Sequence, residues 1–211
     1  MHDVLDTGRR IYVVSTGTNE IVEFDADFAE LSRRRYSEAP DSWHLNCLGV
    51  DREGRVFFSA FGEFEATRGY KKSAVGAGFI RSCDDNENLV TGLSQPHNVL
   101  FHESGLYVAD SGSKRVCRAD GGAIRIQHEV DGYPRGLALV DDVLYVGLSR
   151  SRNVELGQSD IRSATVLALR KDTLDEIGRL SLPADEIYDI RYVVHEGRFA
   201  GLCRDVSAHG V

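Results

Sequence analysis

The stretch Gln95–Asp120, QPHNVLFHESGLYVADSGSKRVCRAD, contains the pattern that decides the fold. Two short apolar runs, 99–101 and 106–109, are separated by a polar turn that ends in Gly105. Glycine tolerates a positive φ angle, which favours tight turns. A second turn precedes the alternating segment 115–118, and nowhere does the stretch show the i, i+3, i+4 spacing of an amphipathic helix. The stretch therefore predicts three short strands joined by turns.

The same pattern recurs along the chain, with an aromatic residue in the second strand of each unit as its marker. The markers are Tyr12, Phe57, Tyr107, Tyr145 and Phe199. Consecutive markers are 45, 50, 38 and 54 residues apart, a spacing that suits four short strands with variable loops. Helical patterning is absent apart from a turn at 173–177. The sequence thus predicts an all-β repeat protein.

The repeat predicts a five-bladed β-propeller of four-stranded antiparallel blades, in which the last blade is incomplete. We expect a single domain over 1–211, with blades at 1–38, 42–94, 95–131, 132–183 and 186–211. An incomplete blade leaves open strand edges, which a protein partner or a second copy of the chain would cover.

Two insertions, 62–76 and 149–163, are long for a propeller loop. Long ordered loops often carry function, although a solvated surface excursion is an equally good interpretation of the first one.

Composition narrows the classes of partner. The chain has 211 residues and a formal net charge of −8, which argues against nucleic acid or an anionic membrane as the main partner. It has no apolar run of membrane-spanning length, and its first residues lack the layout of a signal peptide. Four widely spread cysteines are typical of reduced, buried thiols. We therefore expect a cytoplasmic protein.

A polar residue stands at the start of the first strand in each unit. Counting ten residues back from each marker, or eleven from Phe57, reaches His2, Asn46, His97, Arg135 and Asp189. In a propeller the innermost strands begin at one mouth of the central channel, so these five side chains would converge there. Convergent polar groups in a pocket are the default hypothesis for a ligand site. A purely structural belt of hydrogen bonds fits the same positions equally well.

The residue types at these positions suit acid–base chemistry on a small molecule. His97 is the predicted acid or base, and Asp189 is its partner or a second carboxylate. Arg135 offers a fixed fork for an anion. The predicted substrate-binding residues are the remaining ring members and their neighbours, namely His2, His44, Asn46, Tyr188 and Arg191.

No cofactor is assigned, although a divalent metal is compatible with the ring. His2, His97 and Asp189, with His44 as a further ligand, offer suitable N and O donors. Arg135 in the same ring argues against a bare cation, so we assign no metal ligand. The sequence contains no GxSxG, HExxH or glycine-rich phosphate motif.

Several stretches carry a resemblance to a known family. They are His44–Leu48 (HLNCL), Ser94–His97 (SQPH), Pro134–Leu137 (PRGL) leading to 146–150, and Glu186–Asp189 (EIYD). In these the chain resembles a bacterial family of uncharacterised propeller proteins, a domain of unknown function sometimes fused to tetratricopeptide repeats. His2 would match an early histidine of that family, and 95–116 resembles an NHL-type repeat.

The resemblance implies a propeller of the same broad type as gluconolactonase-like and strictosidine-synthase-like proteins, and it implies no reaction. The metal-binding acidic and amide set of the gluconolactonase group does not map onto the five ring positions.

Three functions remain open. The first is an enzyme of the hydrolase, lyase or isomerase type that acts on a small anionic or hydroxylated molecule at the channel mouth. The second is a non-catalytic module that binds a ligand or a protein, and the third is a purely structural role. The mixture of acid–base, anion-binding and amide groups favours the first, because a scaffold needs no such mixture.

Overall fold

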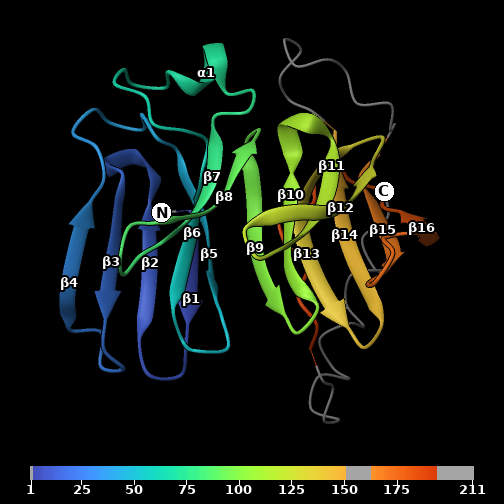
Figure 1. Cartoon of the computed structure of the whole chain (residues 1–211), viewed down its shortest axis with the longest axis horizontal. Coiled ribbons are helices and arrows are strands. Elements are labelled where there is room, and N and C mark those ends of the chain that lie inside the picture. The colour runs from blue at the N-terminus through green and yellow to red at the C-terminus, as the bar shows by residue number, and fades with distance from the viewer. Residues whose placement is uncertain (1, 151–162, 194–211) are drawn as a thin grey trace, which may run out of the picture.

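The structure is a computed structural model that describes residues 2–150 and 163–193. Within these residues, sixteen strands form four antiparallel sheets of four strands each. Every sheet consists of four consecutive strands in meander order, so each sheet is one repeat of the sequence pattern (Figure 1). The all-β prediction is confirmed.

The elements follow one another along the chain without crossovers. The first sheet contains β1 (Asp3–Asp6), β2 (Ile11–Ser15), β3 (Glu20–Phe24) and β4 (Glu30–Arg35). The second contains β5 (Leu45–Val50), β6 (Val56–Ala60), β7 (Gly78–Ser82) and β8 (Asn88–Leu93). The third contains β9 (Pro96–His102), β10 (Gly105–Asp110), β11 (Arg115–Asp120) and β12 (Ala123–Glu129). The fourth contains β13 (Tyr133–Val140), β14 (Val143–Ser149), β15 (Thr165–Arg170) and β16 (Glu176–Ser181).

The predicted number of blades was wrong for the part of the chain that is described. Four sheets are present rather than five, and residues 186–193 contain no strand. The sequence pattern that starts at Ile190 is typical of a strand, but a strand forms only with a hydrogen-bonded neighbour. The neighbour predicted for it, around Phe199, lies outside the described residues, as does most of the insertion 149–163.

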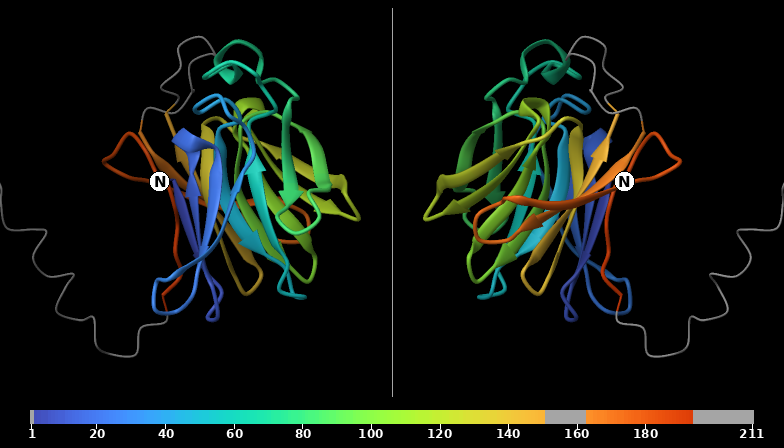
Figure 2. Two further views of the ribbon diagram at one scale, coloured as in Figure 1. Left: turned by 90° about the vertical axis from the view of Figure 1, so that its left-hand side faces the viewer. Right: turned by 90° about the vertical axis from the view of Figure 1, so that its right-hand side faces the viewer.

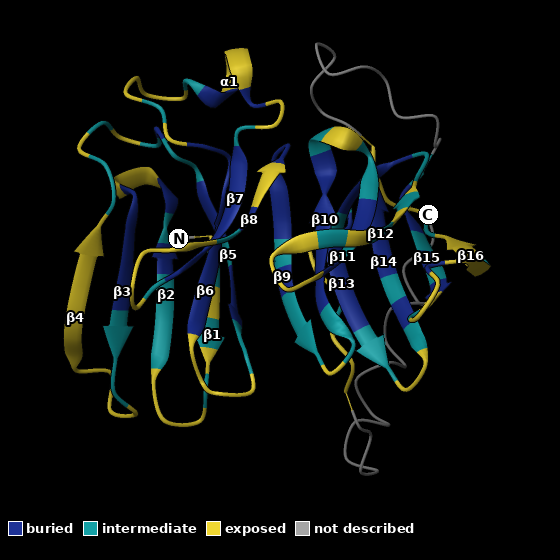
Figure 3. Ribbon diagram, in the orientation of Figure 1, coloured by how far each residue is buried: buried dark blue, intermediate teal, exposed yellow. Residues whose placement is uncertain are grey.

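The outermost strand is the most exposed strand of each sheet (Figure 3). All five residues of β6 are buried, whereas all six of β4 are exposed. Strand β12 alternates between exposed and half-buried residues, because successive side chains point to opposite faces of a sheet.

The hydrophobic core lies between consecutive sheets, which pack face to face. One cluster joins Val14 of the first sheet to Phe58 of the second, and another joins Ile80 of the second to Val108 of the third. Gly49 in β5 permits the closest approach, since a Cβ there would lie 2.1 Å from the Val99 carbonyl oxygen of β9. Apolar burial of this kind is the main stabilising term of such a domain.

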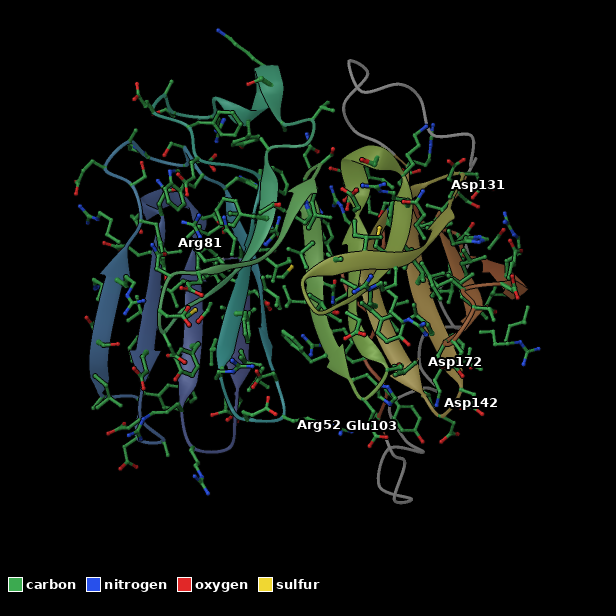
Figure 4. The ribbon with its side chains drawn as sticks, viewed as in Figure 1. Arg52, Arg81, Glu103, Asp131, Asp142 and Asp172 are labelled. Carbon is green, nitrogen blue, oxygen red and sulfur yellow. The ribbon has the colours of Figure 1, made fainter. Side chains whose placement is uncertain are left out.

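Loops at the two ends of the sheets differ in what they carry. The insertion 62–76 contains a one-turn helix, α1 (Tyr70–Ser73), which the sequence did not predict, and it lies over one end of the molecule (Figure 2). At the opposite end, an ion pair between Arg52 and Glu103 joins the turns of the second and third sheets (Figure 4). Among the described residues, no helix is long and apolar enough to span a membrane.

Candidate functional site

A central cavity of about 390 Å³ lies between the inner strands. Strands β1, β5, β9 and β13 line it together with the segment 188–191. Six of the eight residues predicted for the site contribute to its lining, namely His2, Asn46, His97, Tyr188, Asp189 and Arg191. Counting back from the aromatic markers therefore reaches residues that share one cavity although they are far apart in sequence.

His97 is held at the start of β9 through one ring nitrogen. Its Nδ1 atom lies 3.0 Å from the Gln95 carbonyl oxygen and 2.8 Å from Ser111 Oγ. A carbonyl oxygen can only accept a hydrogen bond, so Nδ1 carries the proton and Nε2 is left as an acceptor. Burial, with Arg135 and His2 nearby, keeps the pKa of His97 well below its usual value. The imidazole is therefore neutral at physiological pH.

Arg135, in β13, lies beside this cavity. Its guanidinium packs over the rings of Tyr133 and Tyr188, 5.2 and 4.6 Å from their centroids. Arg135 Nη1 is 3.7 Å from a Glu186 carboxylate oxygen, too far for a hydrogen bond. Its buried Nε and Nη1 atoms have no hydrogen-bond acceptor among the described residues. The fork thus has donors available for an anion.

Asn46, in β5, contributes another donor without a partner. Its side chain is fully buried, and its Oδ1 accepts a hydrogen bond from the Cys47 thiol. Nδ2 has no acceptor among the described residues. A buried donor left unpaired costs about 1–3 kcal/mol, so an acceptor from a ligand or water is expected here.

His2 stands at the start of β1, where its backbone N–H donates to the Val14 carbonyl oxygen. Burial, with His44 and Arg135 nearby, lowers the pKa of His2 to about 4. The neighbouring Cys47 is also kept neutral, since burial and the charge of Asp3 raise the pKa of its thiol to about 12. A protonated thiol is a poor nucleophile, so Cys47 does not serve as one.

The segment that carries Asp189 lies against the fourth sheet. Ile187 exchanges hydrogen bonds with Ser149 Oγ, and a Cβ on Gly136 would lie 2.7 Å from the Asp189 carbonyl carbon. The Asp189 carboxylate accepts hydrogen bonds from Ile190 N and from Arg191 Nε, at 2.9 and 2.5 Å. No hydrogen bond joins it to His97 within 2–150 and 163–193, so the predicted pairing of these two residues is not seen.

His44 lies just outside the cavity lining, on the turn before β5. Its ring is 5.7 Å from that of His2, and it packs against Phe61 and Tyr70 of the following loop. Its Nδ1 is hydrogen-bonded to Asp41, which was not among the predicted site residues. The spacing in DSWH, with an acidic residue three positions before a histidine, was the available signal.

A metal centre does not emerge from the described part of the chain. In residues 2–150 and 163–193, no three His, Cys, Asp or Glu side chains are grouped so that they could hold a metal ion. His2, His97 and Asp189 share the cavity wall, but Asp189 is engaged by Arg191. The donors with free capacity are amide and guanidinium N–H groups, which suit an anion.

The sheets and the central cavity define a propeller-like all-β protein. The chain belongs to the family described as Domain of unknown function (DUF4915), whose model matches residues 1–199. No curated protein matches the chain.

Solved structures with the same fold include proteins of several kinds. Virginiamycin B lyase from Staphylococcus aureus is 14% identical, with a TM-score of 0.57 over 86% of this chain and 55% of that one. A protein described as a candidate gluconolactonase is 17% identical, with a TM-score of 0.58 over 88% and 64%. BamB from Moraxella catarrhalis is 12% identical, with a TM-score of 0.52 over 83% and 47%. The chain thus spans less than two thirds of each of these proteins, and the likeness shows the fold alone.

Proposed function

We propose that this protein is an enzyme that binds a small anionic or hydroxylated molecule at the mouth of the central cavity and acts on it by proton transfer. The observation that carries the proposal is the set of buried donors that have no acceptor among residues 2–150 and 163–193, namely Asn46 Nδ2 and the Nε and Nη1 atoms of Arg135. A ligand rich in oxygen acceptors would satisfy them, and charge-assisted hydrogen bonds to a guanidinium are strong.

The remaining residues take roles that fit their contacts. His97 presents Nε2 as an acceptor for a substrate hydroxyl, and Arg135 binds the anionic group. Asn46 and His2 position the substrate, while Asp189, fixed by Arg191, supplies a second carboxylate. Tyr188 packs on the guanidinium and contributes to the wall of the cavity. Such a set serves a hydrolase, lyase or isomerase.

Two of the similar structures support this choice by what they are. One is a lyase, of which a histidine-to-alanine variant is described as catalytically inactive. Another is described as a candidate gluconolactonase. A reaction of the same broad type is therefore within reach of the fold.

Ligand binding tests the proposal. We would titrate D-gluconate, citrate, inorganic phosphate and glucono-δ-lactone into the protein by calorimetry, and follow conversion of each organic compound by NMR. At least one compound should bind, and Arg135→Gln should weaken it about tenfold or more, equivalent to about 1.4 kcal/mol. Arg125→Gln removes the same charge from the exposed face of β12 and should leave binding unchanged. Equal binding by Arg135→Gln, or no binding at all, would contradict the proposal.

The second candidate is a non-catalytic ligand-binding module. The lowered pKa values of His2 and His97 favour it, because neutral imidazoles accept hydrogen bonds well but are weak bases. Binding that depends on Arg135 without conversion of any compound would establish this candidate instead. A protein partner or second copy at 186–211 stays a prediction, since residues 194–211 lie outside the described part of the chain.

A further inference from the structure

The turn before β5 places a carboxylate and an imidazole in direct contact. Asp41 Oδ1 is 2.7 Å from His44 Nδ1, and both side chains are largely buried. The other oxygen, Oδ2, accepts hydrogen bonds from Arg68 Nε and from the Tyr70 hydroxyl, each at 3.0 Å. These donors come from the insertion 62–76, so the loop that covers this end of the molecule holds the carboxylate in place.

The contacts determine which nitrogen of His44 carries a proton. Burial opposes ionisation of Asp41, but the hydrogen bonds from His44, Tyr70 and Arg68 outweigh it and lower the pKa of Asp41. An ionised carboxylate only accepts hydrogen bonds, so His44 Nδ1 is the donor, and in the neutral ring Nε2 is the acceptor. The ring lies 4.2 Å from the centroid of Phe61 and 4.5 Å from that of Tyr70, which limits its rotation.

The turn itself does not account for this pair. Gln95 stands two residues before His97, just as His44 stands two residues before Asn46. Both residues have a φ angle of 52°, so this backbone conformation is shared by the second and third sheets. In the third sheet the side chain is an amide that accepts a hydrogen bond from Tyr133. Of these two sheets, the second has a histidine at this place with a carboxylate beside it.

We propose that Asp41 and His44 form an acid–base unit at the mouth of the cavity, in which His44 Nε2 exchanges the proton and Asp41 is a positioning residue. This inference rests on the proposed function and assigns its proton-transfer step to His44, with His97 as a hydrogen-bonding group. His44 lies just outside the cavity lining, with its ring 5.7 Å from that of His2, which is part of the lining. A substrate that extends from Arg135 and Asn46 toward His2 would therefore approach His44.

The step balances without a further reagent. A substrate O–H or C–H bond breaks, its proton moves to Nε2, and the electron pair stays on the substrate. The imidazolium that forms is compensated by the Asp41 carboxylate, while Nδ1 keeps its own proton. The proton on Nε2 then passes to the leaving group or to the product, which restores the neutral ring.

The tautomer of His44 tests the geometry without a substrate. Long-range ¹H–¹⁵N NMR correlations at pH 8 should show His44 with the proton on Nδ1 only, because the carboxylate accepts from that atom. In Asp41→Asn the signal should change toward a mixture of tautomers. A wild-type His44 that carries its proton on Nε2 would overturn the proposal whatever the reaction proves to be.

Chemical labelling tests the link between His44 and the ligand site. Diethyl pyrocarbonate acylates unprotonated imidazole nitrogens, and mass spectrometry locates the labelled residue. His44 should be labelled, and the anion that binds most tightly in the calorimetric panel should protect it. His128, on the outer strand β12, should be labelled equally with and without that anion. An unreactive His44, or one that the anion does not protect, would overturn the proposal.

Kinetics separate this inference from the proposed function. For the compound that is converted, His44→Gln should lower kcat about 10²–10⁴-fold with little change in KM, and His128→Gln should change neither. Asp41→Asn should lower kcat in the same range, and His44→Gln remains informative if loss of Asp41 unfolds the loop. Full kcat in His44→Gln would remove the acid–base unit and leave the proposed function standing. The proposed function itself fails if Arg135→Gln binds as tightly as the wild type, or if no compound of the calorimetric panel binds.

Discussion

His97 lies at the start of the inner strand of the third sheet, and His44 stands two residues before the equivalent position, Asn46, of the second sheet. The two histidines differ in the group that accepts the hydrogen bond from Nδ1. His97 donates to a neutral carbonyl oxygen and has a neutral hydroxyl beside it, with the cation Arg135 nearby. His44 donates to a carboxylate that two further donors hold in place. Both rings present Nε2 as an acceptor, but only His44 has a negative charge to stabilise its protonated form.

The contrast between His97 and His44 shows that the residue type alone does not define an acid–base group. A neutral partner fixes the tautomer of His97 and leaves it a hydrogen-bonding group, because burial disfavours its charged form. A carboxylate partner fixes the same tautomer in His44 and also compensates the charge that proton transfer creates. Three measurements of stability test this contrast.

The largest expected effect is that of removing the His97 side chain. His97 is 6% exposed, so His97→Ala leaves a cavity and leaves the Gln95 carbonyl oxygen without the hydrogen bond from Nδ1. We expect the free energy of unfolding to fall by about 2–4 kcal/mol. His44→Ala, at a side chain that is 19% exposed, should cost about 1 kcal/mol. Urea unfolding measures both. Equal losses at the two positions would remove the contrast in burial on which the different roles depend.

The pH dependence of stability should show the buried neutral histidine. The folded protein keeps the pKa of His97 below the ordinary value of 6.5, because of burial, Arg135, His2 and His44. Below pH 6.5, His97 therefore binds a proton in the unfolded chain but stays neutral in the folded protein. The free energy of unfolding falls as the pH falls. Between pH 7 and 5 this one group should account for a loss of about 1–2 kcal/mol.

The variant His97→Gln provides the comparison for that titration. It keeps a polar side chain of similar length and should show a flatter pH dependence between pH 7 and 5. His2, whose pKa is lowered to about 4, contributes in the same direction and remains in the variant. Asp41 has a lowered pKa and acts at lower pH, since its contribution is lost only as the carboxylate becomes protonated. Identical profiles for wild type and variant would show that His97 is not held neutral by burial.

The smallest expected effect is that of Tyr70→Phe. The change removes the hydroxyl that donates to Asp41 Oδ2 and leaves the hydrogen bond from Arg68 in place. We expect a loss of about 0.5–1.5 kcal/mol by thermal unfolding, the net value of one hydrogen bond. Tyr192→Phe, at an exposed tyrosine, should change stability by less. A neutral Tyr70→Phe would mean that the loop does not hold the carboxylate.

Much of the fold could be predicted because strand period and turn chemistry are local. The markers Tyr12, Phe57, Tyr107 and Tyr145 all lie in the second strand of a sheet. The apolar runs 99–101 and 106–109, which were expected to be strands, lie within β9 and β10. The number of blades depends on hydrogen bonding between strands. The residue pattern after Asp189 predicts a strand but not whether that strand has a neighbour.

The site was predictable where it follows from the repeat and not where it depends on loops. His2, Asn46 and His97 share a cavity because each begins an inner strand, a position that counting can find. Asp41 receives its donors from Arg68 and Tyr70, 27 and 29 residues further along the chain. Those contacts arise from the packing of the insertion 62–76 over the mouth, and no local pattern encodes them.

A crystal structure of the protein soaked with the tightest-binding compound of the calorimetric panel tests the central claim most directly. We expect density for the compound at the mouth of the cavity, with an acceptor atom within about 3 Å of the Arg135 guanidinium or of Asn46 Nδ2. Density confined to other surfaces, with these donors bonded only to the protein or to water, would contradict the claim that the mouth is the functional site.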